Sequence, residues 1–189
     1  MYAVGATINA LTIGAALMFL ANWLFAALAS VALSLEPEAS AWQRHQTEFN
    51  FLGVTSSYTC DGLESKVRQI LLFMGARNDL KVRANGCTRG PDALTHAIWV
   101  SVDFYSLVAT DPPSAAQAVQ ARWTPLNLNA QRPDFMGRGD CELVDGMKQV
   151  LKQNFAWRGL TVQVDCAPHE LSLDDFHVQG EVLMTASPN

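Results

Sequence analysis

Residues 58–87 read YTCDGLESKVRQILLFMGARNDLKVRANGC, and their pattern decides the fold. Apolar side chains recur there at helical spacing, at Leu63, Val67, Ile70, Leu71 and Met74. Gly75 follows this stripe and is a typical helix stop. An alternating stretch then occupies Leu80, Val82 and Ala84. The pattern predicts a helix followed by a strand, enclosed by Cys60 and Cys87.

A second stretch repeats this arrangement over residues 140–166, which read DCELVDGMKQVLKQNFAWRGLTVQVDC. Its helical stripe comprises Leu143, Met147, Val150, Leu151 and Phe155, and its strand alternates at Leu160, Val162 and Val164. Asp140 stands where a helix N-cap is expected. Cys141 and Cys166 hold the same places as the cysteines of the first stretch.

The four cysteines allow three disulfide pairings. No two of these cysteines are spaced as a C-x-x-C motif. Because the two stretches place their cysteines at equivalent positions, we expect the disulfides Cys60–Cys87 and Cys141–Cys166. Closing loops of this length contributes about 3–4 kcal/mol in the chain-entropy treatment. The alternative is that Cys60 and Cys141, each at a helix N-terminus, are activated thiols.

Three further stretches are typical of strands: 48–59, 95–107 and the region around Phe176 and Met184. In the second of these, one face carries Ile98, Val100, Val102 and Phe104, and the other carries Trp99, Ser101, Asp103 and Tyr105. The element order is then β-α-β-β-α-β, with the stretch around Phe176 and Met184 as an additional terminal strand. This order predicts a ferredoxin-like α+β sandwich, with two helices on one face of an antiparallel sheet and the other face open.

The N-terminal region has no Asp, Glu, Lys or Arg before Glu36. Residues 11–29 form a nearly unbroken apolar run that ends in Ala-Leu-Ala, so residues 1–29 predict either a cleaved signal peptide or an uncleaved membrane anchor. Both interpretations place the remaining chain outside the cytoplasm: periplasmic, secreted, or held at the inner membrane. Contact with a membrane is expected only through this helix, if it stays uncleaved. We expect a polar spacer over 30–46 and a single domain over 47–189.

Residues 109–139 connect the two halves and contain four prolines, at 112, 113, 125 and 133. Proline density of this kind predicts a long loop without extended regular structure. Such connections often carry function, but a surface excursion pinned by Trp123 and Phe135 is the simpler interpretation.

Composition limits the partners of this 189-residue chain. The formal net charge of −5 argues against nucleic acid as a main partner. We find no P-loop, G-x-S-x-G, H-E-x-x-H or Rossmann motif, and we expect no cofactor. The candidate binding residues are the aromatic side chains Trp99, Tyr105 and Trp123. The weak candidates for metal ligation are His169 and His177, which lie in a polar cluster that fits no common ligand spacing.

The stretch 58–87 resembles a family of small, uncharacterised secreted or periplasmic proteins of Gram-negative bacteria. The resemblance rests on Cys60-Asp61-Gly62-Leu63-Glu64, on Leu71 with Gly75-Ala76-Arg77, and on the closing Gly86-Cys87. It covers about a sixth of the chain. It implies an extracytoplasmic setting, and it implies no activity and no site residues.

The sequence therefore predicts a disulfide-stabilised, non-enzymatic domain that binds a protein or another component of the cell envelope through its open sheet face and long loop. A second hypothesis is a thiol-redox or metal-binding protein that uses Cys60 and Cys141, or His169 and His177. A third is a hydrolase with no recognisable motif.

Overall fold

The computed structural model describes residues 38–87, 94–109, 118–170 and 175–186. The protein is mixed α+β, and its elements follow one another as β1 (Glu38–Leu52), β2 (Tyr58–Thr59), α2 (Cys60–Phe73), β3 (Lys81–Asn85), β4 (Leu94–Thr95), β5 (Ala97–Ala109), β6 (Val119–Asn129), the 3-10 turn η2 (Arg138–Asp140), α3 (Cys141–Gln153), β7 (Trp157–Asp165) and β8 (Asp175–Thr185).

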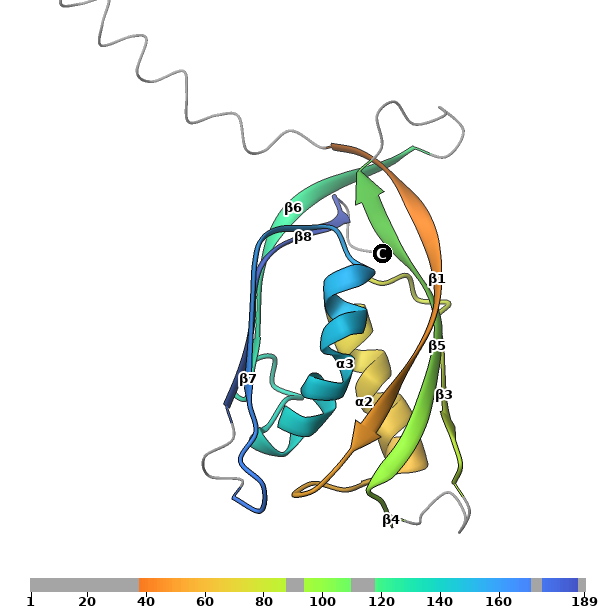
Figure 1. Cartoon of the computed structure of the whole chain (residues 1–189). Helices are drawn as coiled ribbons and strands as arrows, with labels where there is room; N and C mark the ends of the chain where they lie inside the picture. Colours follow the sequence, from red (N-terminus) through yellow and green to blue (C-terminus); the bar gives the residue numbers. More distant parts are fainter. Residues whose placement is uncertain (1–37, 88–93, 110–117, 171–174, 187–189) are drawn as a thin grey trace, which may run out of the picture. The chain divides into compact units, whose positions relative to one another are not determined.

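One antiparallel six-stranded sheet has the order β3-β5-β1-β6-β8-β7, and β2 and β4 form a small separate sheet. The large sheet consists of two three-stranded halves, and only three residue pairs of β1 and β6 join them: Glu38 with Ala121, Ala39 with Gln120, and Ser40 with Val119. From this junction, which we call the closed end, the halves diverge, and α2 and α3 lie between them (Figure 1). Each half contributes its strands in the same way, as a β-α-β-β unit.

The main core fills the space between the two halves. Its fully buried side chains come from both helices and from the strand faces turned toward them, and they include Phe51, Leu63, Ile70, Leu71, Phe104, Leu128, Leu143, Met147, Leu151, Phe176 and Val178. Gly146 allows α3 to approach β1 closely, because a Cβ at this position would lie 2.5 Å from the carbonyl oxygen of Asn50.

Both predicted disulfides are present, and each closes one α-β unit. Cys60 is bonded to Cys87 and Cys141 to Cys166, and the chain has no free cysteine. The predicted helix stop at Gly75 is also confirmed, since this residue adopts the left-handed φ of 90° that favours glycine. In β5, the predicted inward and outward faces are correct: Ile98, Val100, Val102 and Phe104 are buried, whereas Trp99 is exposed.

The ferredoxin-like order is not confirmed, because the sheet has two more long strands than the predicted order allows. One of them, β6, crosses the region that we expected to be a loop over 109–139. Pro125 is tolerated within it because β6 pairs with β1 only through its first three residues, so at Pro125 one side of the strand needs no N–H donor. The other, β8, was expected only as an additional terminal strand.

The start of the domain also differs from the expectation. β1 begins at Glu38, inside the stretch 30–46 that we expected to be a polar spacer. The alternation was hidden because β1 carries polar side chains on both faces before Phe49: Arg44 on one and His45 and Thr47 on the other.

The predicted signal peptide or anchor over 1–29 lies outside the described residues. Within the described part of the chain, no helix is both long and apolar enough to cross a membrane.

Candidate functional site

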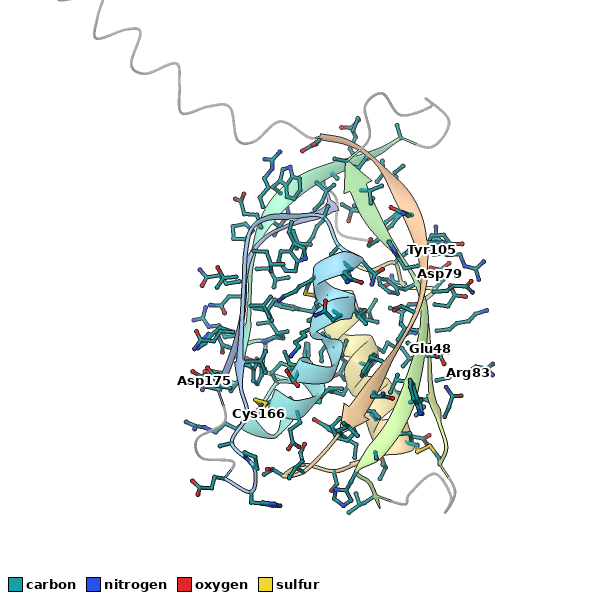
Figure 2. The ribbon with its side chains drawn as sticks, viewed as in Figure 1. Glu48, Asp79, Arg83, Tyr105, Cys166 and Asp175 are labelled. Atoms are coloured by element: carbon teal, nitrogen blue, oxygen red, sulfur yellow. A yellow bond between two sulfur atoms is a disulfide. The ribbon has the colours of Figure 1, made fainter. Side chains whose placement is uncertain are left out.

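The outer face of the β3-β5-β1 half points away from both helices. Strand register brings its side chains into rows: Gln46, Asp103 and Lys81 lie opposite one another, and so do Glu48, Ser101 and Arg83, and Asn50, Trp99 and Asn85. Figure 2 shows Glu48, Arg83 and Tyr105 on this side of the sheet. We call this surface the outer face. It is the open sheet face that the sequence predicted.

A charge network organises the middle of the outer face. Arg44 donates two hydrogen bonds to Asp103, Nε to Oδ1 at 2.9 Å and Nη2 to Oδ2 at 2.6 Å, and Gln46 adds a longer one. These bonds from Arg44 hold the pKa of the Asp103 carboxyl below its usual value, and they raise the pKa of Arg44. Asp103 is therefore ionised and already paired.

A shallow groove of about 560 Å³ lies beside this network, between β1, β5 and β3. Lys81 and Arg83 line it, and neither forms an ion pair with any residue that the structure describes. Glu48 and Asn85 instead bond the Ser101 hydroxyl, which donates to Glu48 at 3.1 Å and accepts from Asn85 at 2.8 Å. The groove thus presents Lys81 and Arg83 to solvent beside the carboxylates of Glu48 and Asp103.

Exposed apolar residues gather at the open end of this half. Among the described residues, the exposed large hydrophobics are Leu52, Val54, Leu94 and Trp99, with exposed fractions of 53–65%. Leu52 lies opposite Ala97, two residues from Trp99 on β5, and Gly53 donates to the carbonyl oxygen of His96 at 2.6 Å. These contacts place Leu52 diagonally across from Trp99 and bring residues 52–54 and 94–97 to the same end of β1 and β5. We call this surface the apolar end.

The other two aromatic candidates are covered by arginines. The Arg77 guanidinium lies 3.7 Å from the ring centre of Tyr105, and Arg158 lies 4.1 Å from that of Trp123. Trp123 also donates from Nε1 to Glu38 and belongs to a small apolar cluster at the closed end. Tyr105 shares the outer face with Trp99 but lies six residues along β5, about 20 Å away. The structure therefore does not bring the three candidates together.

The histidine candidates do not form a metal centre in the described residues, among which no group of three or more metal-ligating side chains occurs. His169 is exposed, has a positive φ of 65°, and donates its backbone N–H to the hydroxyl of Thr55. His177 lies 3.3 Å from Asp175, measured from Nε2 to Oδ1.

A buried polar contact that sequence reasoning missed links His45, Ser106 and Asn154. His45 Nε2 lies 2.9 Å from the Ser106 hydroxyl, which itself donates to the carbonyl oxygen of Asn154. Burial lowers the pKa of His45 despite an opposing contribution from Asn154. Ser106 is only 1% exposed, so this histidine–serine pair cannot act on a substrate.

A second missed contact centres on Asp140. Its carboxylate accepts from the Tyr58 hydroxyl, from the backbone N–H of Gly137 at 2.7 Å, and from Lys66 Nζ at 3.2 Å. Burial, together with the hydrogen bond to Asp140, raises the pKa of Tyr58. Asp140 is 5% exposed, so its hydrogen bonds and its ion pair serve contacts within the protein. The cluster joins the first unit to the second.

Glu142 makes a similar connection at the surface. Its carboxylate accepts hydrogen bonds from the backbone N–H groups of Val54, Thr55 and Ser56 and from the Ser56 hydroxyl. Burial alone would raise the pKa of Glu142, but these bonds outweigh it and hold the pKa below its usual value. Spacing along the sequence could not reveal these contacts between the units, because Tyr58 and Lys66 lie more than 70 residues from Asp140, and residues 54–56 lie more than 80 residues from Glu142.

In comparisons with known proteins, no family model matches the chain, and neither a curated protein nor a solved structure matches it. The candidate site therefore rests on geometry alone.

Proposed function

We propose that this chain is a non-catalytic, extracytoplasmic binding domain that holds a protein segment carrying both apolar and acidic side chains. The observation that carries the proposal is the apolar end, where Trp99 is 57% exposed diagonally across from Leu52, and Val54 and Leu94 are exposed farther along the same end of the sheet. Exposed apolar side chains that gather in one place are typical of an interaction surface, whereas isolated ones are ordinary.

Trp99 has the character of an anchor residue. It projects from a central strand of its half, and its neighbours across the strands are the small polar residues Asn50 and Asn85. A rigid aromatic side chain on a paired strand loses little conformational entropy when a partner covers it.

The charge of the adjacent groove indicates the partner's chemistry. Lys81 and Arg83 have no ion-pair partner among the described residues, whereas the nearby Asp103 is neutralised by Arg44. A segment with an apolar side chain for Trp99 and carboxylates for the two cations complements both features.

The two disulfides support the extracytoplasmic location that we propose. Two structural disulfides in a domain of this size are typical of an oxidising environment. The predicted N-terminal signal or anchor and the family resemblance agree with a location in the periplasm or outside the cell.

Selection from a random peptide library displayed on phage tests the proposal. We expect the enriched peptides to combine an aromatic or aliphatic residue with Asp or Glu. Synthetic copies should bind the wild-type protein at least about tenfold more tightly than Trp99→Ser or Lys81→Glu/Arg83→Glu. Arg122→Glu is the matched control, because Arg122 is an exposed cation on the other half of the sheet, and it should leave affinity unchanged.

Two results contradict the proposal. One is an enriched set of basic peptides. The other is a set of peptides that bind Trp99→Ser as tightly as the wild type, which would place the interaction on another surface.

A further inference from the structure

The two edges of the sheet differ in how their backbones are covered. At the β3 edge, side chains of α2 take up one backbone N–H of the strand and two carbonyl oxygens of the residues just before it. Arg68 donates to the carbonyl oxygens of Leu80 at 2.8 Å and Asn78 at 2.7 Å, and Glu64 accepts from the N–H of Ala84 at 2.8 Å. An approaching strand finds these groups already occupied.

The β7 edge has no such cover. β7 is nine residues long, against five for β3, and within the described residues no side chain hydrogen-bonds to its backbone. The reason lies in α3. When the two helical stripes are aligned from Leu63 and Leu143, the positions of Glu64 and Arg68 hold Val144 and Lys148. Val144 is a buried apolar residue, and Lys148 pairs with Asp145 within its own helix at 2.7 Å.

The inner side chains of β7 are also incompletely covered. Leu160, Val162 and Val164 are half-buried against the core, whereas Val178 and Phe176, which pair with Val162 and Val164 on the adjacent β8, are fully buried. A strand added beside β7 would cover this apolar row while it satisfies the free backbone groups.

From these observations we propose that β7 is a self-association edge, at which two copies of this chain pair antiparallel about a two-fold axis at Val162. In this register Thr161 of each copy faces Gln163 of the other, and Leu160 faces Val164. Asp165 of each copy then approaches the bulge at Arg158 and Gly159 of the other, so opposite charges meet at both ends of the interface.

Two-fold antiparallel pairing is disfavoured at the β3 edge, and this contrast supports β7 as the edge that pairs with a second copy. Antiparallel pairing of two β3 strands about Val82 would place Lys81 of each copy against Arg83 of the other, and like charges directly opposite are destabilising. β3 therefore resists pairing through both its charges and its covered edge. β7 lacks both obstacles over residues 160–165.

Sedimentation velocity of the protein recovered from an exporting host, over a concentration series, tests the proposal. We expect a monomer–dimer equilibrium in the wild type. The double variant Thr161→Lys/Gln163→Arg places a lysine of each copy opposite an arginine of the other, as in β3. It should therefore raise the dissociation constant of the dimer at least about tenfold. Arg122→Ala, a change at an exposed position of β6 opposite Met184, is the control and should leave the constant unchanged.

A charge exchange tests the register. Arg158→Asp and Asp165→Arg should each weaken the dimer, and the double variant should restore it, because the opposite charges still meet. The Arg158–Glu38 ion pair is lost in Arg158→Asp and in the double variant alike, so its loss does not affect that comparison. Val162→Cys should form an intermolecular disulfide at the axis, whereas Val82→Cys, at a similar half-buried position of β3, should not.

Three outcomes overturn the proposal: a wild type that stays monomeric at every concentration, a dimer that survives Thr161→Lys/Gln163→Arg unchanged, or a charge exchange that fails to restore association. The first would leave the β7 edge to a strand from another protein. The second would place self-association elsewhere, with the apolar end the first surface to examine.

Discussion

The two α-β units share a plan and differ in how they face solvent. In both, a disulfide ties the start of a helix to the end of the following strand, over 27 residues in one and 25 in the other. The half that holds the first unit adds an outer face with two cations that have no ion-pair partner among the described residues, and Glu64 and Arg68 cover part of its edge. The second leaves a longer edge open. The comparison teaches that one architecture can direct its two halves toward different contacts through a few surface residues.

The largest expected effect tests whether the two disulfides are equivalent. Replacing either pair by alanine should lower the free energy of unfolding by about 3.5 kcal/mol, because the loops that they close are nearly equal in length. Urea unfolding of the two double variants measures this. A difference of more than about 1 kcal/mol between them would mean that packing, and not loop closure, sets their contributions.

The next test separates the two carboxylates through which the units hold each other. Asp140→Ala should cost about 3 kcal/mol, because it leaves Lys66 and Tyr58 without their partner in a buried site. Glu142→Ala should cost about 1 kcal/mol, since water can reach the amides of residues 54–56. Equal losses in denaturant unfolding would contradict this ranking.

A smaller effect is expected at the covered edge. Glu64→Gln should change stability by less than about 1 kcal/mol but speed amide hydrogen exchange at Ala84, whose N–H loses a charged acceptor. Amides on β7 serve as the internal reference and should exchange as in the wild type. An unchanged exchange rate at the Ala84 amide would show that Glu64 does not protect the backbone of the β3 edge.

The smallest effect concerns pH and the contact between β1, β5 and the end of α3. Because burial lowers the pKa of His45 in the folded state, the unfolded chain binds a proton there first as the pH falls through the usual histidine range. The stability contribution is complete above that range and decreases on acidification, by about 0.5 kcal/mol or less for a half-buried group. His45→Gln should reduce the difference in unfolding free energy between pH 7.5 and pH 5.5, and an unchanged difference would assign the pH dependence to other groups.

Local patterns predicted the fold where apolar periodicity is strong. The two helices, the strands after them, both disulfides and the two faces of β5 follow from spacing alone, since each depends on residues close in sequence. β1 and β6 escaped prediction for opposite reasons. β1 is polar on both sides around His45, and β6 contains Pro125, which only an unpaired strand side tolerates.

The candidate site was predictable only in part. Alternation in β5 identified Trp99 as outward-facing, but it could not show that Leu52 lies diagonally across from it, because strand register sets that neighbourhood. Tyr105 and Trp123 had the same sequence signal as Trp99. What distinguishes them is the arginine that covers each ring, and these arginines come from other elements.

The β1–β6 junction has a topological consequence. Ala121 pairs with Glu38 on one side and with Thr185 on the other. The start of β1 and the end of β8 therefore lie two strand spacings apart, about 10 Å. A peptide of three or four residues can span this gap. The folded domain can therefore be spliced as one piece into a surface loop of another protein, or have its ends joined and a new opening made elsewhere, without separating its sheet.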